Sequence, residues 1–141
     1  MKFIKTVEKL IERAEKKGVA TLNRKVNDGY FTYSLVTKEV YRVEKEGNIF
    51  TLYHYGTKTC QVDTATNEIL YIYGESISDS DSIFTFLHYF DIVLTFGYKP
   101  VNGGFYAIVN GQQIFINDFE GAKNFTEAIK KEFEEVEKFG N

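Results

Sequence analysis

Apolar residues recur at helical spacing near the start of the chain. They are Phe3, Ile4, Val7, Leu10, Ile11 and Ala14, and Lys and Glu occupy most of the positions between them. This spacing places the apolar side chains on one face of an α-helix. Gly18 follows the last of them, and glycine at that place commonly ends a helix. The pattern therefore predicts an amphipathic N-terminal helix that ends at Gly18.

The following region is rich in Tyr, Val, Ile, Phe and Thr, the residues that favour β-strands. The predicted strands are Tyr30–Val36, Glu39–Glu44, Ile49–Tyr55, Thr59–Val62 and Ile69–Tyr73. Short turn sequences separate most of them, for example Glu46-Gly47-Asn48. Short connections join antiparallel neighbours, so we expect an antiparallel meander.

A stretch rich in Ser and Asp follows the strands and predicts the start of a central helix. Ser78 has the character of an N-cap, with Asp81 three residues further on as in a capping box. An apolar stripe follows, formed by Ile83, Phe86, Leu87, Phe90 and Val93 or Leu94. We expect this helix to extend from about Asp79 to Thr95.

Asn110-Gly111 is a strong signal for a two-residue hairpin turn. It lies between the predicted strands Phe105–Val109 and Gln112–Ile116, and direct pairing puts Ala107 opposite Ile114 and Tyr106 opposite Phe115. Asp118 can cap a last helix, in which Phe119, Ala122, Ile129, Phe133 and Val136 keep helical spacing. The C-terminal part is therefore predicted as a hairpin followed by a helix.

These elements predict one α+β domain over residues 1–141. The expected architecture is an antiparallel sheet of about five to seven strands, packed with an N-terminal, a central and a C-terminal helix. A chain of 141 residues is long enough to bury its own core, and no low-complexity linker divides it. A single cysteine excludes an internal disulfide, and no apolar run approaches the roughly 18 residues of a membrane span. We expect a cytoplasmic protein that does not act at a membrane.

The net charge of −3 is unevenly distributed. Residues 1–25 contain eight Lys or Arg and three Glu, whereas residues 26–117 contain five basic and ten acidic residues. A dedicated nucleic-acid binder needs a broad basic face, which this distribution does not supply. The acidic body is better suited to a basic protein partner.

His54 and the only cysteine, Cys60, lie on neighbouring predicted strands. If the turn is Gly56-Thr57-Lys58, His54 lies opposite Cys60; if it is Gly56-Thr57, His54 faces Thr59 and the two side chains point to opposite sides. A hydrolase would use the pair as nucleophile and base, which needs further groups as well. Apolar residues such as Leu52 share the same face of the predicted strands. They favour the alternative of a buried thiol beside a hydrogen-bonded histidine. We expect no catalytic residues, no metal site and no cofactor.

Glu75, Asp79 and Asp81 form a local acidic cluster beside Tyr73. The carboxylates suit the positive end of a helix dipole, and they lack the loop of alternating oxygen ligands that calcium needs. They can also attract Arg or Lys of a partner protein, so these four residues are the predicted partner-binding residues.

Aromatic residues also follow the predicted strands and offer an alternative. The stripes Tyr30/Phe31/Tyr33, Tyr53/Tyr55 and Tyr71/Tyr73 can stack bases, as in sheet-based proteins that bind single-stranded nucleic acid. Core packing, a protein-binding face or a homodimer explains the same residues, and the acidic charge favours protein.

Two sequence blocks carry a family resemblance: YHYGT at residues 53–57, and SISDSDSIFTFLHYF at residues 76–90. Together they resemble a family of small proteins carried by bacteriophages and other mobile elements, in which a YHYGT strand end precedes an SxSDxDSIxxFLxxF helix start. The resemblance covers residues 49–96. It implies a phage accessory protein, and the size and acidic body are similar to those of type II anti-CRISPR proteins, which inhibit an RNA-guided DNA nuclease. The expected function is inhibition of that nuclease by direct binding; the alternative is an accessory protein that binds single-stranded nucleic acid.

Overall fold

A computed structural model describes residues 4–27, 35–92, 95–99, 104–109 and 112–115. These residues form two α-helices and eight β-strands. In chain order the elements are α1 (Lys5–Lys17), β1 (Val19–Asn27), β2 (Leu35–Glu46), β3 (Ile49–His54), β4 (Thr57–Asp63), β5 (Glu68–Ile72), α2 (Ile77–Tyr89), β6 (Thr95–Lys99), β7 (Gly104–Val109) and β8 (Gln112–Phe115).

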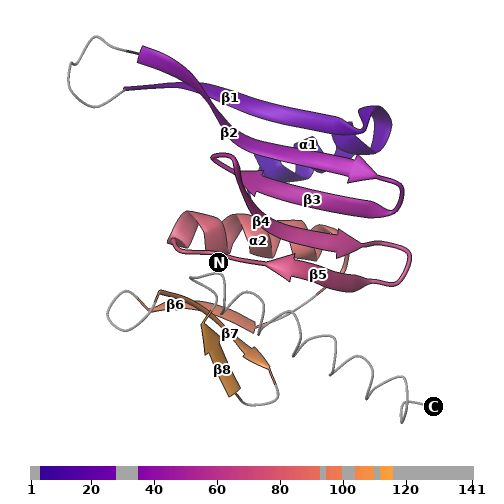
Figure 1. The fold of residues 1–141 in the computed structure, drawn as a ribbon, viewed down its shortest axis with the longest axis vertical. Helices are drawn as coiled ribbons and strands as arrows, with labels where there is room; N and C mark the ends of the chain where they lie inside the picture. Colours follow the sequence, from indigo (N-terminus) through magenta and orange to yellow (C-terminus); the bar gives the residue numbers. More distant parts are fainter. Residues whose placement is uncertain (1–3, 28–34, 93–94, 100–103, 110–111, 116–141) are drawn as a thin grey trace.

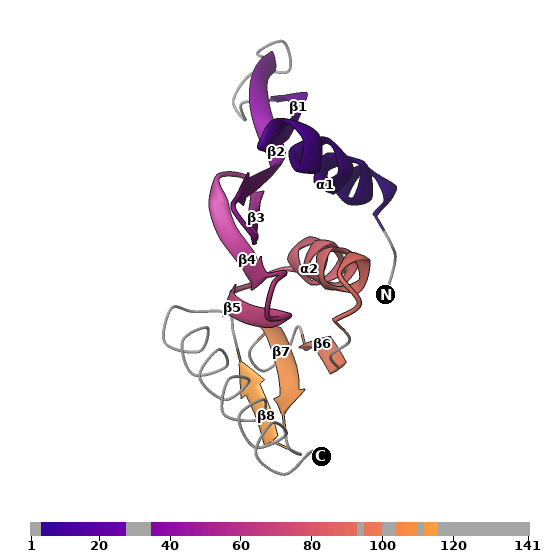
Figure 2. The ribbon, with the colours of Figure 1, turned by 90° about the vertical axis from the view of Figure 1, so that its right-hand side faces the viewer.

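The first five strands form one antiparallel sheet in the order β1-β2-β3-β4-β5, as expected of a meander (Figure 1). Seen from the side in Figure 2, α1 and α2 both lie on the same face of this sheet. No described helix covers the other face. The α+β class predicted from the sequence is confirmed.

The N-terminal helix forms as its apolar spacing predicts. Its buried residues are Val7, Leu10, Ile11 and Ala14. Gly18 ends the helix with a left-handed φ of 85°, and its N–H donates to the carbonyl of Ala14. Glycine adopts this conformation without the steric cost that a Cβ imposes. The junction between α1 and β1 is also bonded to the sheet, because Lys45 N–H of β2 donates to the carbonyl of Gly18 at 2.8 Å.

The first strand was missed by the sequence prediction. β1 begins directly after Gly18, and the two strands predicted at Tyr30–Val36 and Glu39–Glu44 correspond, in their described part, to the single strand β2. Residues 30–34 lie outside the described residues. Arg24 and Lys25 belong to β1, so five of the eight basic residues among residues 1–25 lie on α1.

The central helix is shorter than predicted and is capped two residues earlier. The N-cap is Ser76, not Ser78, and its Oγ accepts a hydrogen bond from Asp79 N–H at 3.1 Å. Phe90 is the C-cap, and Thr95, the predicted helix end, already belongs to β6. Part of the apolar stripe nevertheless faces the core as expected, since Ile83, Phe86 and Leu87 are buried.

A second, three-stranded antiparallel sheet has the order β6-β7-β8 and lies next to the β5 end of the larger sheet (Figures 1 and 2). Its β7–β8 hairpin has the predicted register, with Ala107 opposite Ile114 and Tyr106 opposite Phe115. β6 was not predicted, so the described strands form two sheets and not one. The helix predicted from Asp118 lies outside the described residues.

One apolar core connects α1, α2 and the inner face of the larger sheet. Its largest fully buried side chains are Phe86, Leu10, Ile11, Leu52, Ile69, Ile72, Ile83 and Leu87. The core ends close to the turn between β3 and β4, where polar side chains replace apolar ones. Neither of the two described helices has the length and apolar character needed to cross a membrane.

Candidate functional site

The turn between β3 and β4 determines where His54 and Cys60 lie. Tyr55 and Gly56 form a two-residue turn with φ angles of 49° and 79°, and His54 pairs with Thr57. Both predicted registers were wrong, because the turn begins one residue earlier and β4 has an irregularity that puts Cys60 opposite Leu52. The two side chains share the inner face of the sheet without lying opposite each other.

Cys60 is a core residue. It is fully buried within the apolar cluster, and this burial raises the pKa of its thiol far above the usual value. The thiolate is the nucleophilic form of cysteine, so Cys60 is not suited to act as a nucleophile. The hydrolase hypothesis, which relied on this thiol, has no support in the geometry.

We expect Cys60 to be unreactive toward a thiol reagent such as DTNB as long as the protein is folded. A buried thiol with a raised pKa forms almost no accessible thiolate at neutral pH. Labelling should become rapid only in denaturant, and its rate in native buffer should follow the unfolding equilibrium. Rapid stoichiometric labelling of the folded chain would contradict the placement of Cys60 in the core.

His54 makes a specific contact that the sequence analysis did not foresee. Its Nδ1 lies 2.6 Å from Oδ1 of Asp79 on α2. The side chains of His54 and Asp79 are 8% and 15% exposed, so little solvent screens this pair. The pair connects the end of β3 to the first turn of α2, across the edge of the core.

Asp79 is held by a set of hydrogen bonds. Its second oxygen, Oδ2, accepts from Glu75 N–H at 3.0 Å, and its own N–H donates to the Ser76 hydroxyl. Burial alone would raise the pKa of Asp79, but the hydrogen bonds from His54 and from Glu75 N–H outweigh it, and the pKa lies below its usual value. Asp79 is therefore a carboxylate at neutral pH and can only accept, which assigns the donated proton to Nδ1 of His54.

The imidazole ring is fixed by aromatic neighbours. Tyr41, directly opposite on β2, stacks on His54 with ring centroids 4.5 Å apart and an interplanar angle of 11°. Tyr55 lies against the ring at 4.8 Å. With its proton on Nδ1, a neutral His54 has a lone pair on Nε2, and the described residues provide no hydrogen-bond partner for that atom.

A groove of about 570 Å³ opens beside this pair. It is lined by His54, Tyr55, Thr57, Thr59, Tyr73, Glu75, Ser76, Ser78 and Asp79. Three of the four predicted partner-binding residues, Tyr73, Glu75 and Asp79, thus line one groove. The fourth, Asp81, is half-buried further along α2 and does not line it. We call this hollow the His54 groove.

The rim of the His54 groove is acidic and aromatic. Glu75 is exposed, and the Tyr73 hydroxyl donates a hydrogen bond to Glu75 Oε1. Partial burial, this hydrogen bond and the nearby carboxylate raise the pKa of Tyr73, so the phenol stays protonated. Tyr73 thereby orients one carboxylate oxygen of Glu75 and leaves the other available.

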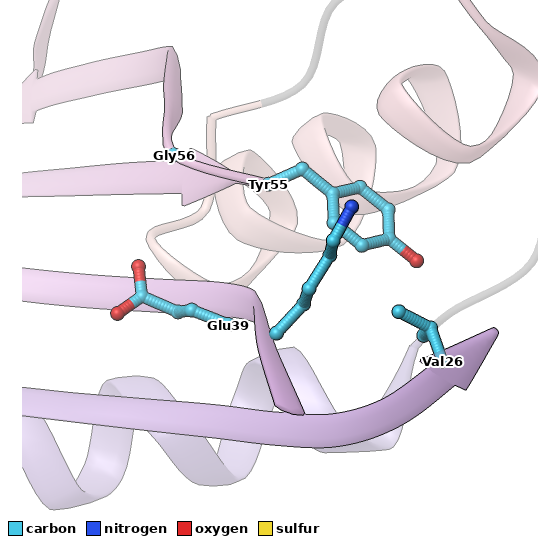
Figure 3. A pocket seen from close by; sticks show the side chains of 5 residues that line it. Val26, Glu39, Tyr55 and Gly56 are labelled. Atoms are coloured by element: carbon cyan, nitrogen blue, oxygen red, sulfur yellow. The ribbon is translucent and has the colours of Figure 1, made fainter. Parts of the chain in front are cut away.

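A second hollow, of about 630 Å³, lies on the other side of the same turn. Figure 3 shows Tyr55 and Val26 lying toward one another at one end and the carboxylate of Glu39 at the other. Lys38 also lines it, so its charged groups are of opposite sign. It contains no buried polar side chain among its lining residues, and it offers less chemistry than the His54 groove.

The face of the sheet opposite the helices contains two cation–π pairs. The Arg42 guanidinium lies 4.0 Å from the centre of the Tyr53 ring, and the Lys58 ammonium lies 4.2 Å from that of Tyr71. Arg42 is also paired with Glu39 at 2.8 Å and with Glu44 at 3.1 Å. Arg42 and Lys58 are therefore already engaged by tyrosines of the same chain, and Arg42 by two carboxylates as well.

Within the described ranges, no group of three or more His, Cys, Asp or Glu residues is arranged to hold a metal ion. Comparison of the chain with protein-family models, with curated proteins and with solved structures finds no match in any of the three. The features of the chain that bear on function are therefore the geometry of the His54 groove and the two sequence blocks that contribute to it.

Proposed function

We propose that this protein is a phage-encoded anti-CRISPR protein that inhibits a type II RNA-guided DNA nuclease by direct, non-enzymatic binding. The contact surface is the acidic and aromatic rim of the His54 groove, formed by Tyr73, Glu75 and Asp79. Such nucleases have arginines that read the protospacer-adjacent motif and basic channels that hold nucleic acid, and both are targets for carboxylates. The protein would act in the cytoplasm of the bacterial host.

The observation that carries the proposal is that two of the three predicted carboxylates, Glu75 and Asp79, line one groove. Glu75 is exposed and oriented by Tyr73, whereas Asp79 lies deeper and is oriented by His54. Charged side chains that are already oriented lose less conformational entropy on binding than mobile ones, which increases affinity. Their charge also attracts a basic partner over a longer distance. The two sequence blocks of the phage-family resemblance supply six of the nine lining residues, from His54 on one side to Asp79 on the other, whereas Thr59, Tyr73 and Glu75 lie outside these blocks.

The alternative, binding of single-stranded nucleic acid, is less well supported. Base stacking needs free aromatic faces beside available cations. On the open face of the sheet, Arg42 and Lys58 already lie over the rings of Tyr53 and Tyr71, and Arg42 is paired with two glutamates. A base would have to displace these cations before it could stack. A binding assay over a range of salt concentrations tests this alternative, since phosphate contacts weaken steeply with salt.

We expect the protein to co-purify with at least one member of a panel of guide-loaded type II nucleases and to reduce its DNA cleavage. In that complex, Glu75→Gln should weaken binding about tenfold, because it removes a rim charge without changing the shape of the side chain. Surface plasmon resonance would measure the affinity and a plasmid-cleavage assay the inhibition.

The matched control is Glu46→Gln. Glu46 is also exposed, but it lies at the opposite end of β3 from the His54 groove, and the substitution changes the net charge by the same amount. Its affinity should remain close to that of the original protein. If no nuclease of the panel binds or is inhibited, the inhibitor function is wrong; if both substitutions weaken binding equally, the groove is not the contact surface.

A further inference from the structure

The floor of the His54 groove has a hydrogen-bond acceptor that nothing in the described chain uses. The His54 side chain is 8% exposed, and its Nδ1 proton is donated to Asp79. Nε2, the other polar atom of the ring, is left as an acceptor in its neutral form. A buried polar atom without a partner is costly, and Nε2 of His54 is not among the fully buried side-chain nitrogens and oxygens of the described residues that lack a hydrogen bond. Nε2 must therefore remain accessible from the groove that His54 lines.

The wall of the groove contains a residue in an unfavourable conformation. Tyr55 has a φ of 49° in a turn where Asn, Asp or Gly is usual, and its side chain is largely exposed. Tyrosine in the left-handed region costs of order 1 kcal/mol, and such strain concentrates at functional sites. The neighbouring Gly56 adopts its φ of 79° without that cost. A tyrosine thus lines the groove at a position where Asn would be the less strained residue.

The electrostatics of the groove favour a cation that donates hydrogen bonds. Asp79 is ionised, Glu75 offers one free carboxylate oxygen, and Nε2 of His54 is an acceptor in the form of the ring that carries its single proton on Nδ1. The described lining residues include no Lys or Arg that neutralises these groups from within. A flat cation fits better than a compact one, because Tyr55 and Tyr73 are among the lining residues and a planar cation can lie against an aromatic ring.

We propose that the His54 groove binds the guanidinium group of an arginine on the partner protein. The planar guanidinium has five N–H donors in a fixed fork, so it can donate to Glu75 and to Nε2 of His54 at once while it lies against the tyrosine rings. An ammonium group lacks the flat surface and the fork geometry. This inference builds on the proposed function, since it names the chemistry by which the nuclease would be recognised.

The test is a titration of the isolated protein with N-acetyl-arginine amide, followed by NMR of the ¹⁵N-labelled imidazole of His54. We expect a saturable shift of the Nε2 resonance with a dissociation constant of about 1 to 10 mM, as befits one side chain of an interface. N-acetyl-lysine amide should bind about tenfold more weakly, and the neutral N-acetyl-citrulline amide should produce no saturable shift. Equal responses to the three compounds, or no shift of Nε2, would overturn the guanidinium assignment.

Two substitutions of exposed residues locate the binding. His54 itself is buried, and replacing it alters the fold as well as the groove. Tyr55→Asn should weaken the binding of the arginine compound at least threefold while the protein becomes no less stable, because Asn tolerates a positive φ. Glu75→Gln should weaken it similarly, and Glu46→Gln should not. Undiminished binding by both Tyr55→Asn and Glu75→Gln would place the arginine elsewhere and refute the inference.

The same variants separate this inference from the proposed function. If a nuclease binds Tyr55→Asn as tightly as the original protein, the inhibitor function stands and the guanidinium contact is wrong. If the arginine compound binds as described but no nuclease does, the groove is an arginine pocket for a different protein, and the nuclease is not the partner.

Discussion

Replacing Phe86 by alanine is expected to lower the free energy of unfolding by about 3 to 5 kcal/mol. Phe86 is fully buried on the face of α2 that packs on the sheet, and its ring lies edge-to-face against Phe90 at a centroid distance of 5.3 Å. Truncation removes the transfer free energy of the ring and leaves a cavity that rigid neighbours fill only in part. Urea denaturation followed by circular dichroism measures the loss.

Ile77→Ala is the control on the same helix. Ile77 is 59% exposed at the first helical position, so its truncation should change the free energy of unfolding by no more than about 0.5 kcal/mol. A similar, small effect of both substitutions would mean that α2 does not pack on the sheet as described. The result matters for the His54 groove, because α2 supplies Asp79.

The sequence predicts the elements whose signal is local. Apolar spacing and Gly18 were enough for α1, and Asn110-Gly111 was enough for the β7–β8 register. β1 was missed because Arg24 and Lys25 interrupt its alternation and most of its side chains are exposed. An edge strand needs no continuous apolar face, since its backbone pairing to β2 supplies the structure.

The candidate site was predictable only in part, for a related reason. Local composition identified Tyr73, Glu75 and Asp79, but it assigned the N-cap to Ser78 because two overlapping Ser-x-x-Asp patterns occur. A long-range contact favours Ser76 as the N-cap, because Asp79 then lies in the first turn of α2 and can reach His54 on β3. The register of His54 relative to β4 depends on an irregularity in that strand, and no pattern in the sequence predicts this irregularity.

Asp79→Ala is expected to lower the free energy of unfolding at neutral pH by about 2 to 3 kcal/mol. The substitution removes a charge-assisted hydrogen bond to His54 and the acceptor for Glu75 N–H, and it leaves the buried Nδ1–H of His54 unpaired. Hydrogen bonds to charged groups contribute more than neutral ones, and an unsatisfied buried donor adds a further cost. Thermal and urea denaturation would measure the loss.

The stability that the Asp79 carboxylate contributes should decrease at low pH. The pKa of Asp79 is lower in the folded protein than the value of about 3.9 expected for the unfolded chain. A carboxyl group with a lowered folded pKa contributes stability that is fully present above the unfolded pKa and is lost as the pH falls through the folded pKa. The difference in stability between the original protein and Asp79→Asn should therefore shrink as the pH falls below about pH 4.

Asp81→Asn is the matched control for this profile, since it neutralises a carboxyl group two residues further along the same helix. The carboxylate that pairs with His54 is that of Asp79, and Asp81 lies beyond the first turn of α2, so Asp81→Asn should change the free energy of unfolding by no more than about 0.5 kcal/mol. A double-mutant cycle with His54→Gln would assign the coupling, which should exceed about 1 kcal/mol for the His54–Asp79 pair and be near zero for His54 with Asp81. Equal losses for the two aspartates, or a loss at Asp79 that persists unchanged below about pH 3, would show that the pair does not hold α2 to the sheet.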